Sequence, residues 1–126
     1  MDVKGKNVFL SGPMTGRDHN NLLAFLDAHQ KLNELGAKYV FNPTFQWCVD
    51  ISHGKRQKSH EHYMRKCIAQ LTHSNSDGER YDLLVSLPGW QDSEGATVER
   101  EVAAALGIPT FEMVSDDEGE GGTDGE

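Results

Sequence analysis

The stretch from Tyr81 to Gly107 constrains the fold most, because it predicts a strand, a loop and a helix in immediate succession. Leucine and valine dominate residues 83–87, and a Pro-Gly pair follows them. A short apolar run of this kind is typical of a parallel strand covered on both faces. Residues 88–95 are mostly small or turn-forming and predict a loop, and residues 96–106 predict a helix. In an open parallel sheet, a loop that follows a strand lies where ligands bind.

The remaining segments extend this pattern into an alternation of strands and helices. Further strands are expected at residues 7–11, 38–42 and 108–114. Helices are expected at residues 20–35, with Asn20 as the N-cap, and at residues 59–71, whereas residues 44–58 show no clear pattern. The alternation predicts an α/β fold: a doubly wound three-layer sandwich, flavodoxin-like or Rossmann-like, with a parallel sheet of about four to five strands.

The charge of the chain is concentrated at its C-terminus. The net charge is −8, and residues 115–126 contain six acidic residues and no Lys or Arg. The other residues comprise 12 basic and 14 acidic side chains, a charge of −2. We therefore expect one domain over residues 1–114 and a disordered, Gly-rich acidic tail over residues 115–126. A nearly neutral domain offers no electrostatic footprint for duplex DNA or RNA.

Composition also indicates the cellular compartment of the protein. The two cysteines, Cys48 and Cys67, have neither framework nor metal-site spacing, which is typical of free thiols in a reducing compartment. No apolar run approaches the ~20 residues of a membrane helix, and the N-terminus does not have the pattern of a signal peptide. We expect no membrane partner and a cytoplasmic protein, and a phage protein acting inside a bacterium would have the same composition.

Two predicted loops lie at the same edge of the expected sheet. The first, Ser11 to Arg17, contains glycines that let the backbone approach a ligand, and Arg17 can pair with a phosphate. In the second loop, Ser93 and the amides near Gly95 could hold an anion or a sugar hydroxyl. The first loop is neither a Walker A motif nor GxGxxG, so ATP and NAD lose support as ligands.

An acid near the start of the last helix is the candidate for chemistry. The helix dipole would stabilise Glu99 as a carboxylate, and a positioned carboxylate is what covalent catalysis at a sugar carbon requires. Glu101 competes for this role, because both acids flank the same apolar stripe. The pattern alone chooses neither between the two acids nor between a catalytic and a plain surface acid.

Three segments together resemble the nucleoside 2-deoxyribosyltransferase superfamily: VFLSGPMTG, FNP and LPGWQDSEGATVEREVAAALG. The likeness is greatest to a small, poorly characterised bacterial and phage branch related to nucleoside 5′-monophosphate N-glycosidases. It covers about residues 7–114, and its SGPMTG and PGWxxSxGAxxE patterns are fairly specific together. In this superfamily a glycine stands four residues before the nucleophilic Glu and a small residue four after it. Gly95 and Ala103 fit that frame for Glu99, so the resemblance selects Glu99 over Glu101.

The resemblance also implies roles for other side chains. Asp82 matches an acid that contacts the base or assists proton transfer. Ser93 matches a serine that contacts a 5′-phosphate in the nucleotide-hydrolysing relatives, where the transferases carry an acid that binds a free 5′-hydroxyl. A further acid of the hydrolases falls here at or beside Cys67, where His60 or His62 could replace it. Substrate-binding residues are expected at Ser11, Gly12, Met14, Arg17, Asn42, Gly89, Trp90, Asp92, Ser93 and Gly95.

These observations support two main hypotheses. In the first, Glu99 attacks C1′ of a (deoxy)nucleoside 5′-monophosphate, Asp82 helps the base to leave, and water or another base resolves the ester without a metal or cofactor. In the second, the chain is a non-catalytic module that senses or sequesters a small nucleotide signal; a scaffold that keeps only the fold is a third reading. The resemblance further implies a homo-oligomer, since family sites are often completed by a neighbouring subunit. Aromatic side chains that could stack on the base are Tyr39, Trp47, Tyr63 and Trp90.

Overall fold

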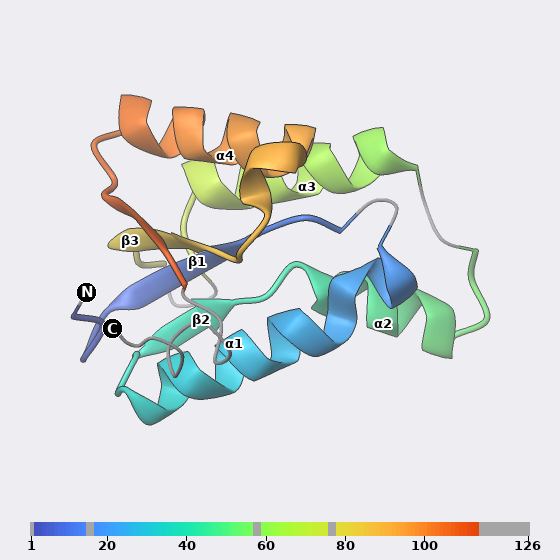
Figure 1. Ribbon diagram of the computed structural model, residues 1–126, viewed down its shortest axis with the longest axis horizontal. Helices are drawn as coiled ribbons and strands as arrows, with labels where there is room; N and C mark the ends of the chain where they lie inside the picture. The colour runs from blue at the N-terminus through green and yellow to red at the C-terminus, as the bar shows by residue number, and fades with distance from the viewer. Residues whose placement is uncertain (1, 15–16, 57–58, 76–77, 114–126) are drawn as a thin grey trace.

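Four parallel strands form the central sheet of the computed structural model, which describes residues 2–14, 17–56, 59–75 and 78–113 (Figure 1). They are β1 (Asn7–Ser11), β2 (Tyr39–Phe41), β3 (Leu83–Ser86) and β4 (Thr110–Glu112). Their order across the sheet is β2-β1-β3-β4. The tail expected at 115–126 lies outside the described residues.

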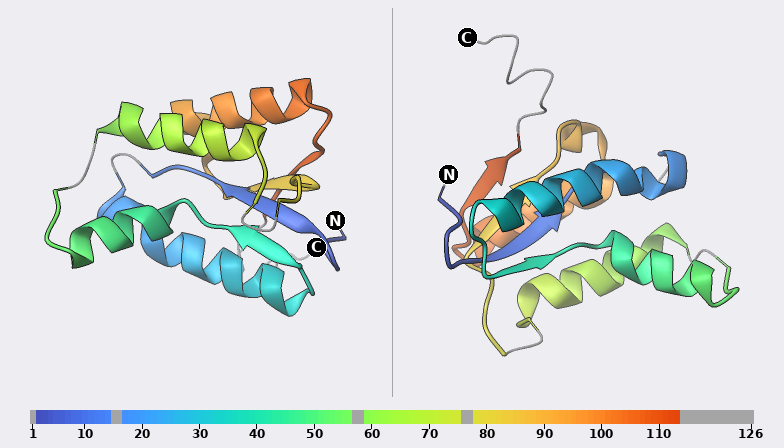
Figure 2. Two further views of the ribbon diagram at one scale, coloured as in Figure 1. Left: turned by 180° about the vertical axis from the view of Figure 1, so that it is seen from behind. Right: turned by 90° about the horizontal axis from the view of Figure 1, so that it is seen from below.

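Helices cover both faces of this sheet. α1 (Leu22–Glu34) lies on one face, and α3 (His60–Thr72) and α4 (Glu94–Ala105) lie side by side on the other (Figures 1 and 2). α2 (Thr44–Ser52) follows β2 and contacts α1, where the rings of His29 and Phe45 stack. Two short 3-10 turns, η1 (Asp18–Asn21) and η2 (Trp90–Asp92), precede α1 and α4. This arrangement confirms the predicted doubly wound three-layer α/β sandwich.

The strands divide their side chains between two apolar clusters, one on each face. Val8 and Leu10 of β1 point to the α1 face, whereas Phe9 lies between them in sequence and packs with Leu71 and Ala103 on the α3/α4 face. Each fully buried side chain of this size contributes about 1.5–3 kcal/mol. The same alternation directs Ser11, the last residue of β1, to the α3/α4 face.

The strand order creates a crevice between β1 and β3. The chain leaves β1 for β2 on one side and returns to β3 on the other side of β1, so the direction of winding reverses between these strands. Ser11 and Ser86, their last residues, are partners in register, and both are completely buried. In open α/β sheets, ligands bind outside the carboxyl ends of strands at this point.

The N-terminus of α1 differs from the prediction. The helix begins at Leu22, and no side chain caps it, so the assignment of Asn20 as N-cap is wrong. His19, Asn20 and Asn21 instead have φ values of 48°, 55° and 64°, a left-handed turn. Asparagine is among the few residues other than glycine that tolerate this conformation.

α2 was not predicted, and its burial explains why. It exposes Phe45, Val49 and Ile51 and buries Thr44 and Asp50, so its apolar side chains do not mark a buried face. In the part of the chain that the structure describes, no helix has the length and apolar character needed to cross a bilayer.

Candidate functional site

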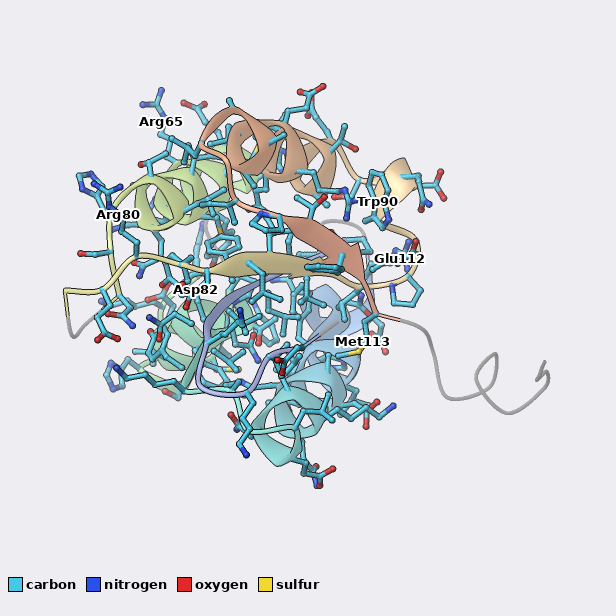
Figure 3. The ribbon with its side chains drawn as sticks, turned by 90° about the vertical axis from the view of Figure 1, so that its left-hand side faces the viewer. Arg65, Arg80, Asp82, Trp90, Glu112 and Met113 are labelled. Carbon is cyan, nitrogen blue, oxygen red and sulfur yellow. The ribbon has the colours of Figure 1, made fainter. Side chains whose placement is uncertain are left out.

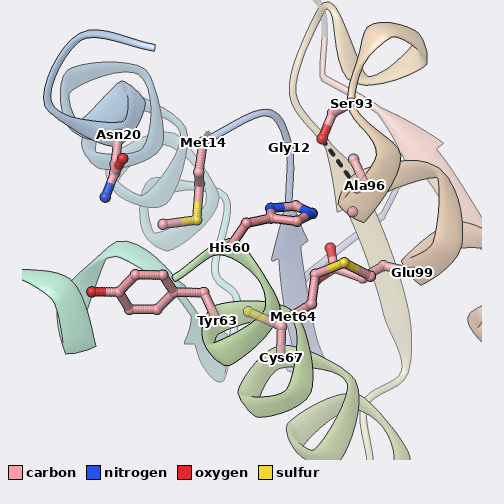
Figure 4. Close-up of a pocket in the computed structure, with 11 residues that line it drawn as sticks. Gly12, Met14, Asn20, His60, Tyr63, Met64, Cys67, Ser93, Ala96 and Glu99 are labelled. Atoms are coloured by element: carbon pink, nitrogen blue, oxygen red, sulfur yellow. Dashed lines mark hydrogen bonds between the residues drawn. The ribbon is translucent and has the colours of Figure 1, made fainter. Parts of the chain in front are cut away.

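A pocket opens beside the crevice between β1 and β3, and residues from both strand exits and from α3 line it (Figure 4). Its volume is about 70 Å³. The lining residues are Gly12, Met14, Asn20, His60, Tyr63, Met64, Cys67, Ser93, Gly95, Ala96 and Glu99. Flexible methionine side chains and one buried carboxyl group therefore share a small, partly apolar hollow.

Glu99 reaches the pocket because it lies on the buried stripe of α4. The buried residues of this helix are Ala96, Glu99 and Ala103, at a spacing that puts them on one face. α4 begins after Ser93, whose hydroxyl oxygen accepts a hydrogen bond of 3.2 Å from the Ala96 amide. The two alanines let the helix approach the sheet closely, so Glu99 is only 7% exposed.

Two side chains hold the Glu99 carboxyl group. Ser11, at the end of β1, donates its hydroxyl proton to Glu99 Oε1, and the Cys67 side chain on α3 forms a second hydrogen bond with the same carboxyl group. Burial raises the pKa of Glu99 to about 7, although the bonds to Ser11 and then to Cys67 act in the opposite direction. Burial and the charge of Glu99 raise the pKa of the Cys67 thiol well above its usual range. Glu99 therefore exchanges its proton near neutral pH, as groups in catalytic sites often do.

The two loops predicted to carry the ligand do meet. A Cβ atom placed on Gly12 would lie 2.8 Å from Leu87 Cβ, so only glycine allows the exits of β1 and β3 to pack this closely. Arg17 crosses to the second loop, where its Nη2 atom would lie 3.3 Å from a Cβ atom on Gly89. The exposed Arg17 guanidinium thus lies beside the turn that leads into α4.

Comparison with known families assigns the domain to a family. A family model matches residues 6–112, a range that contains all four strands and every residue of the pocket. The chain belongs to the family described as Domain of unknown function (DUF4406). No curated protein and no solved structure matches it. The family description names no activity.

The pocket of this DUF4406 domain contains several of the side chains expected from sequence. Gly12, Met14, Ser93, Gly95 and Glu99 line it, and the completely buried Ser11 supports Glu99 from β1. Of the two competing acids, Glu99 lies in the pocket and Glu101 is exposed.

Other expected binding residues lie outside the pocket lining. Asn42 serves the start of α2, where its Oδ1 accepts hydrogen bonds from the Thr44 amide and hydroxyl at 3.0 and 2.6 Å. Trp90 lies under the Arg100 guanidinium, whose Cζ is 4.1 Å from the ring centroid. Arg17, Gly89 and Asp92 do not line the pocket, and Arg17 and Asp92 are exposed.

The predicted partnership of Asp82 with Glu99 is contradicted by the fold. Asp82 precedes β3 and lies at the amino edge of the sheet, exposed, with its Oδ2 accepting a hydrogen bond of 2.8 Å from the Asn7 amide (Figure 3). The pocket lies past the carboxyl edge, and a four-residue strand separates the two edges by about 13 Å. Asp82 therefore does not lie near Glu99 within this chain.

α3 supplies four pocket residues, of which Met64 was not anticipated from the sequence. His60, Tyr63, Met64 and Cys67 line the pocket from one face of this helix, a spacing that the sequence already displays. His60 also reaches α4, with its Nε2 3.5 Å from Glu94 Oε1. Of the four aromatic side chains proposed to stack on a base, Tyr63 is the one among the described lining residues.

Arg100 was also missed, and it fixes α4 on the sheet. Its guanidinium donates to Ser86 Oγ at 2.9 Å and to Thr110 Oγ1 at 3.1 Å while lying over Trp90. These contacts set the orientation of the helix one residue after Glu99. The described residues include no group of three or more His, Cys, Asp or Glu side chains placed to hold a metal ion.

Proposed function

We propose that this DUF4406 domain cleaves, or transfers at, the N-glycosidic bond of a (deoxy)nucleoside 5′-monophosphate, with Glu99 as the nucleophile. The observation that carries this proposal is the buried Glu99 carboxyl group, held by Ser11 in a pocket at the reversal point of the sheet, with a pKa of about 7. A carboxyl group is buried at a cost, and near-neutral titration suits it to chemistry at the pH of a cell.

The chemistry needs only the carboxylate and a proton. The Glu99 carboxylate attacks C1′, the bond from C1′ to the base breaks, and a glycosyl ester forms. The departing base takes a proton, for which His60, in the same pocket, is the candidate donor in place of Asp82. Water or a second base then attacks C1′ and restores the carboxylate, giving hydrolysis or transfer.

Features at the start of α4 favour a phosphate on the sugar. Because the Ser93 hydroxyl oxygen accepts from the Ala96 amide, its own proton is available to a ligand. The first amides of α4 and the nearby Arg17 add positive potential. A hydroxyl donor and positive potential attract a 5′-phosphate more strongly than a free 5′-hydroxyl.

The pocket must widen to accept this substrate. Its volume of about 70 Å³ is below the roughly 300–1,000 Å³ that is typical of ligand pockets. Met14 and Met64 line it, and methionine side chains change rotamer readily. We propose that these two side chains move aside when the nucleotide binds.

The direct test compares free-base release by the parent, Glu99→Gln and the control Glu101→Gln. Each protein is incubated with ribo- and deoxyribonucleoside 5′-monophosphates and with the matching nucleosides, and released base is measured by mass spectrometry. We expect release from a monophosphate by the parent and by Glu101→Gln, and a loss of at least about 1000-fold in Glu99→Gln. Release by Glu99→Gln at the parent rate would refute the assignment.

A nucleotide-binding module without catalysis is the second candidate, and the position of Asp82 away from Glu99 favours it. In that case the parent would retain a nucleotide and release it unchanged, with no free base.

The resemblance also suggests a cytoplasmic homo-oligomer. Light scattering of the purified chain gives the number of subunits.

A further inference from the structure

Asn20 occupies an unusual position beside the pocket. It is the middle residue of the left-handed turn formed by His19, Asn20 and Asn21, with a φ of 55°. Three consecutive residues other than glycine in this conformation are strained, and such strain persists where the surrounding structure holds it. Strained backbone conformations of this kind concentrate at ligand sites.

The Asn20 side chain is buried without a protein partner. Asn20 is 6% exposed and lines the pocket, yet its side-chain amide makes no hydrogen bond to any residue that the structure describes. The next residue is different, because Asn21 Nδ2 donates to the Pro13 carbonyl at 3.0 Å. Its polar atoms are not among the fully enclosed atoms that lack a partner, so the amide is accessible to a ligand that enters the pocket.

The pocket has two chemically distinct ends (Figure 4). Ser93 and Glu99 lie at one end, Asn20 and Tyr63 lie at the other, and His60 lies between them. A sugar phosphate at the Ser93 end would direct the base on C1′ toward Asn20 and the flat ring of Tyr63. An amide offers a donor next to an acceptor, which pairs with the adjacent acceptor and donor on a nucleobase edge.

We propose that Asn20 determines base specificity, by pairing its side-chain amide with an adjacent donor and acceptor on the base of the bound nucleotide. This inference rests on the proposed function and names a contact that selects among its substrates. The competing explanation is that asparagine stands here only because it tolerates the left-handed backbone. Replacement by glycine separates the two, since glycine adopts this backbone without strain but has no amide.

The test measures Asn20→Gly beside the control His19→Gly, which changes an exposed residue of the same turn. Free-base release is followed for monophosphates of the common bases, and urea unfolding reports stability. We expect Asn20→Gly to be at least as stable as the parent, to lose about tenfold or more in release of the preferred base, and to discriminate less between bases. His19→Gly should keep both the rate and the order of preference.

Asn20→Asp provides a second measurement, because it has nearly the same shape but no amide donor. We expect it to change which base is preferred. If Asn20→Gly and Asn20→Asp keep the parent's ratio of rates between bases, Asn20 is there for its backbone alone and the inference is overturned, while the proposed function stands. If the parent releases no base from any nucleotide, the proposed function fails and the inference fails with it.

Discussion

At the scale of single residues, the proposed chemistry depends on how burial and hydrogen bonding together set the pKa of Glu99. Burial favours the protonated form, and the Ser11 and Cys67 bonds favour the carboxylate. The result is a pKa of about 7, at which both forms are populated in neutral solution. Activity that needs the carboxylate should therefore rise with pH through about 7.

The raised pKa of Glu99 predicts how its contribution to stability changes with pH. The folded protein holds this proton more tightly than the unfolded chain, whose carboxyl groups titrate near 4.5. The stabilising contribution is complete below about pH 4.5 and is lost as the pH rises through about 7, a change of about 3 kcal/mol. Urea unfolding from pH 4 to 8 should show Glu99→Gln gaining that much stability relative to the parent. Parallel stability curves for the two proteins would contradict the pKa shift.

Ser11→Ala tests the hydrogen bond that restrains this shift. Without the Ser11 hydroxyl the pKa of Glu99 should rise further, so base release should begin at higher pH than in the parent. The variant should also lose about 1–3 kcal/mol, because the Glu99 oxygen is left without its partner. The matched control is Ser52→Ala, whose exposed hydroxyl bonds only the Val49 carbonyl. An unchanged pH profile in Ser11→Ala would show that the bond does not tune Glu99.

At the scale of elements, small residues decide how closely strands and helices approach around the pocket. Gly12→Ala would put a Cβ atom 2.8 Å from Leu87 Cβ, and we expect a loss of about 1–3 kcal/mol in the free energy of unfolding. In Gly95→Ala the new Cβ atom would be 3.7 Å from His60 Cε1 and Met64 Cγ, an ordinary contact. That variant should gain up to about 1 kcal/mol from helix propensity. Because its methyl group enters the pocket, it should bind nucleotide more weakly.

Urea unfolding and nucleotide titration of both glycine variants check this contrast. Equal losses in the free energy of unfolding at the two positions would mean that the contact between Gly12 and Leu87 does not require glycine. Full nucleotide affinity in Gly95→Ala would mean that the ligand does not occupy the pocket beside α4.

Arg100→Lys tests the attachment of α4 to the sheet. A lysine ammonium can neither bond Ser86 Oγ and Thr110 Oγ1 in the same planar geometry nor lie flat on Trp90. We expect a loss of about 1–3 kcal/mol and a change in tryptophan fluorescence. Arg65→Lys is the control, since its exposed pair with Glu61 should be worth less than about 1 kcal/mol. Similar losses in the two variants would contradict the role of Arg100.

At the scale of the whole molecule, the fold was readable from sequence and the site only in part. Apolar runs such as Leu83–Leu87 are local signals, and they produced the correct order of the four parallel strands and of the helices other than α2. α2 was not predicted from the sequence because its apolar side chains do not form a buried stripe; tertiary packing orients it instead. The left-handed turn at Asn20 was not predicted, because the sequence does not distinguish an asparagine that caps a helix from one in a left-handed backbone conformation.

Asp82 shows why assembling a site from sequence is harder than predicting a fold. The family resemblance suggested its role, but a residue that precedes a parallel strand lies at the opposite edge from a loop that follows one. The sequence could not show that His60 and Cys67 face Glu99, since the face of α3 that lines the pocket depends on how α3 packs against α4. Element order is set locally, whereas the neighbours of Glu99 are set by packing.

Denaturing mass spectrometry tests directly whether Glu99 forms a covalent bond to the sugar. The parent is incubated with a 2′-deoxy-2′-fluoronucleoside 5′-monophosphate, whose fluorine slows the breakdown of a glycosyl ester, then quenched in acid and digested. We predict one added fluorosugar phosphate on the peptide that contains Glu99, with the base absent, and no addition in Glu99→Gln. An adduct on another residue, or rapid base release from protein that never carries an adduct, would refute covalent catalysis by Glu99.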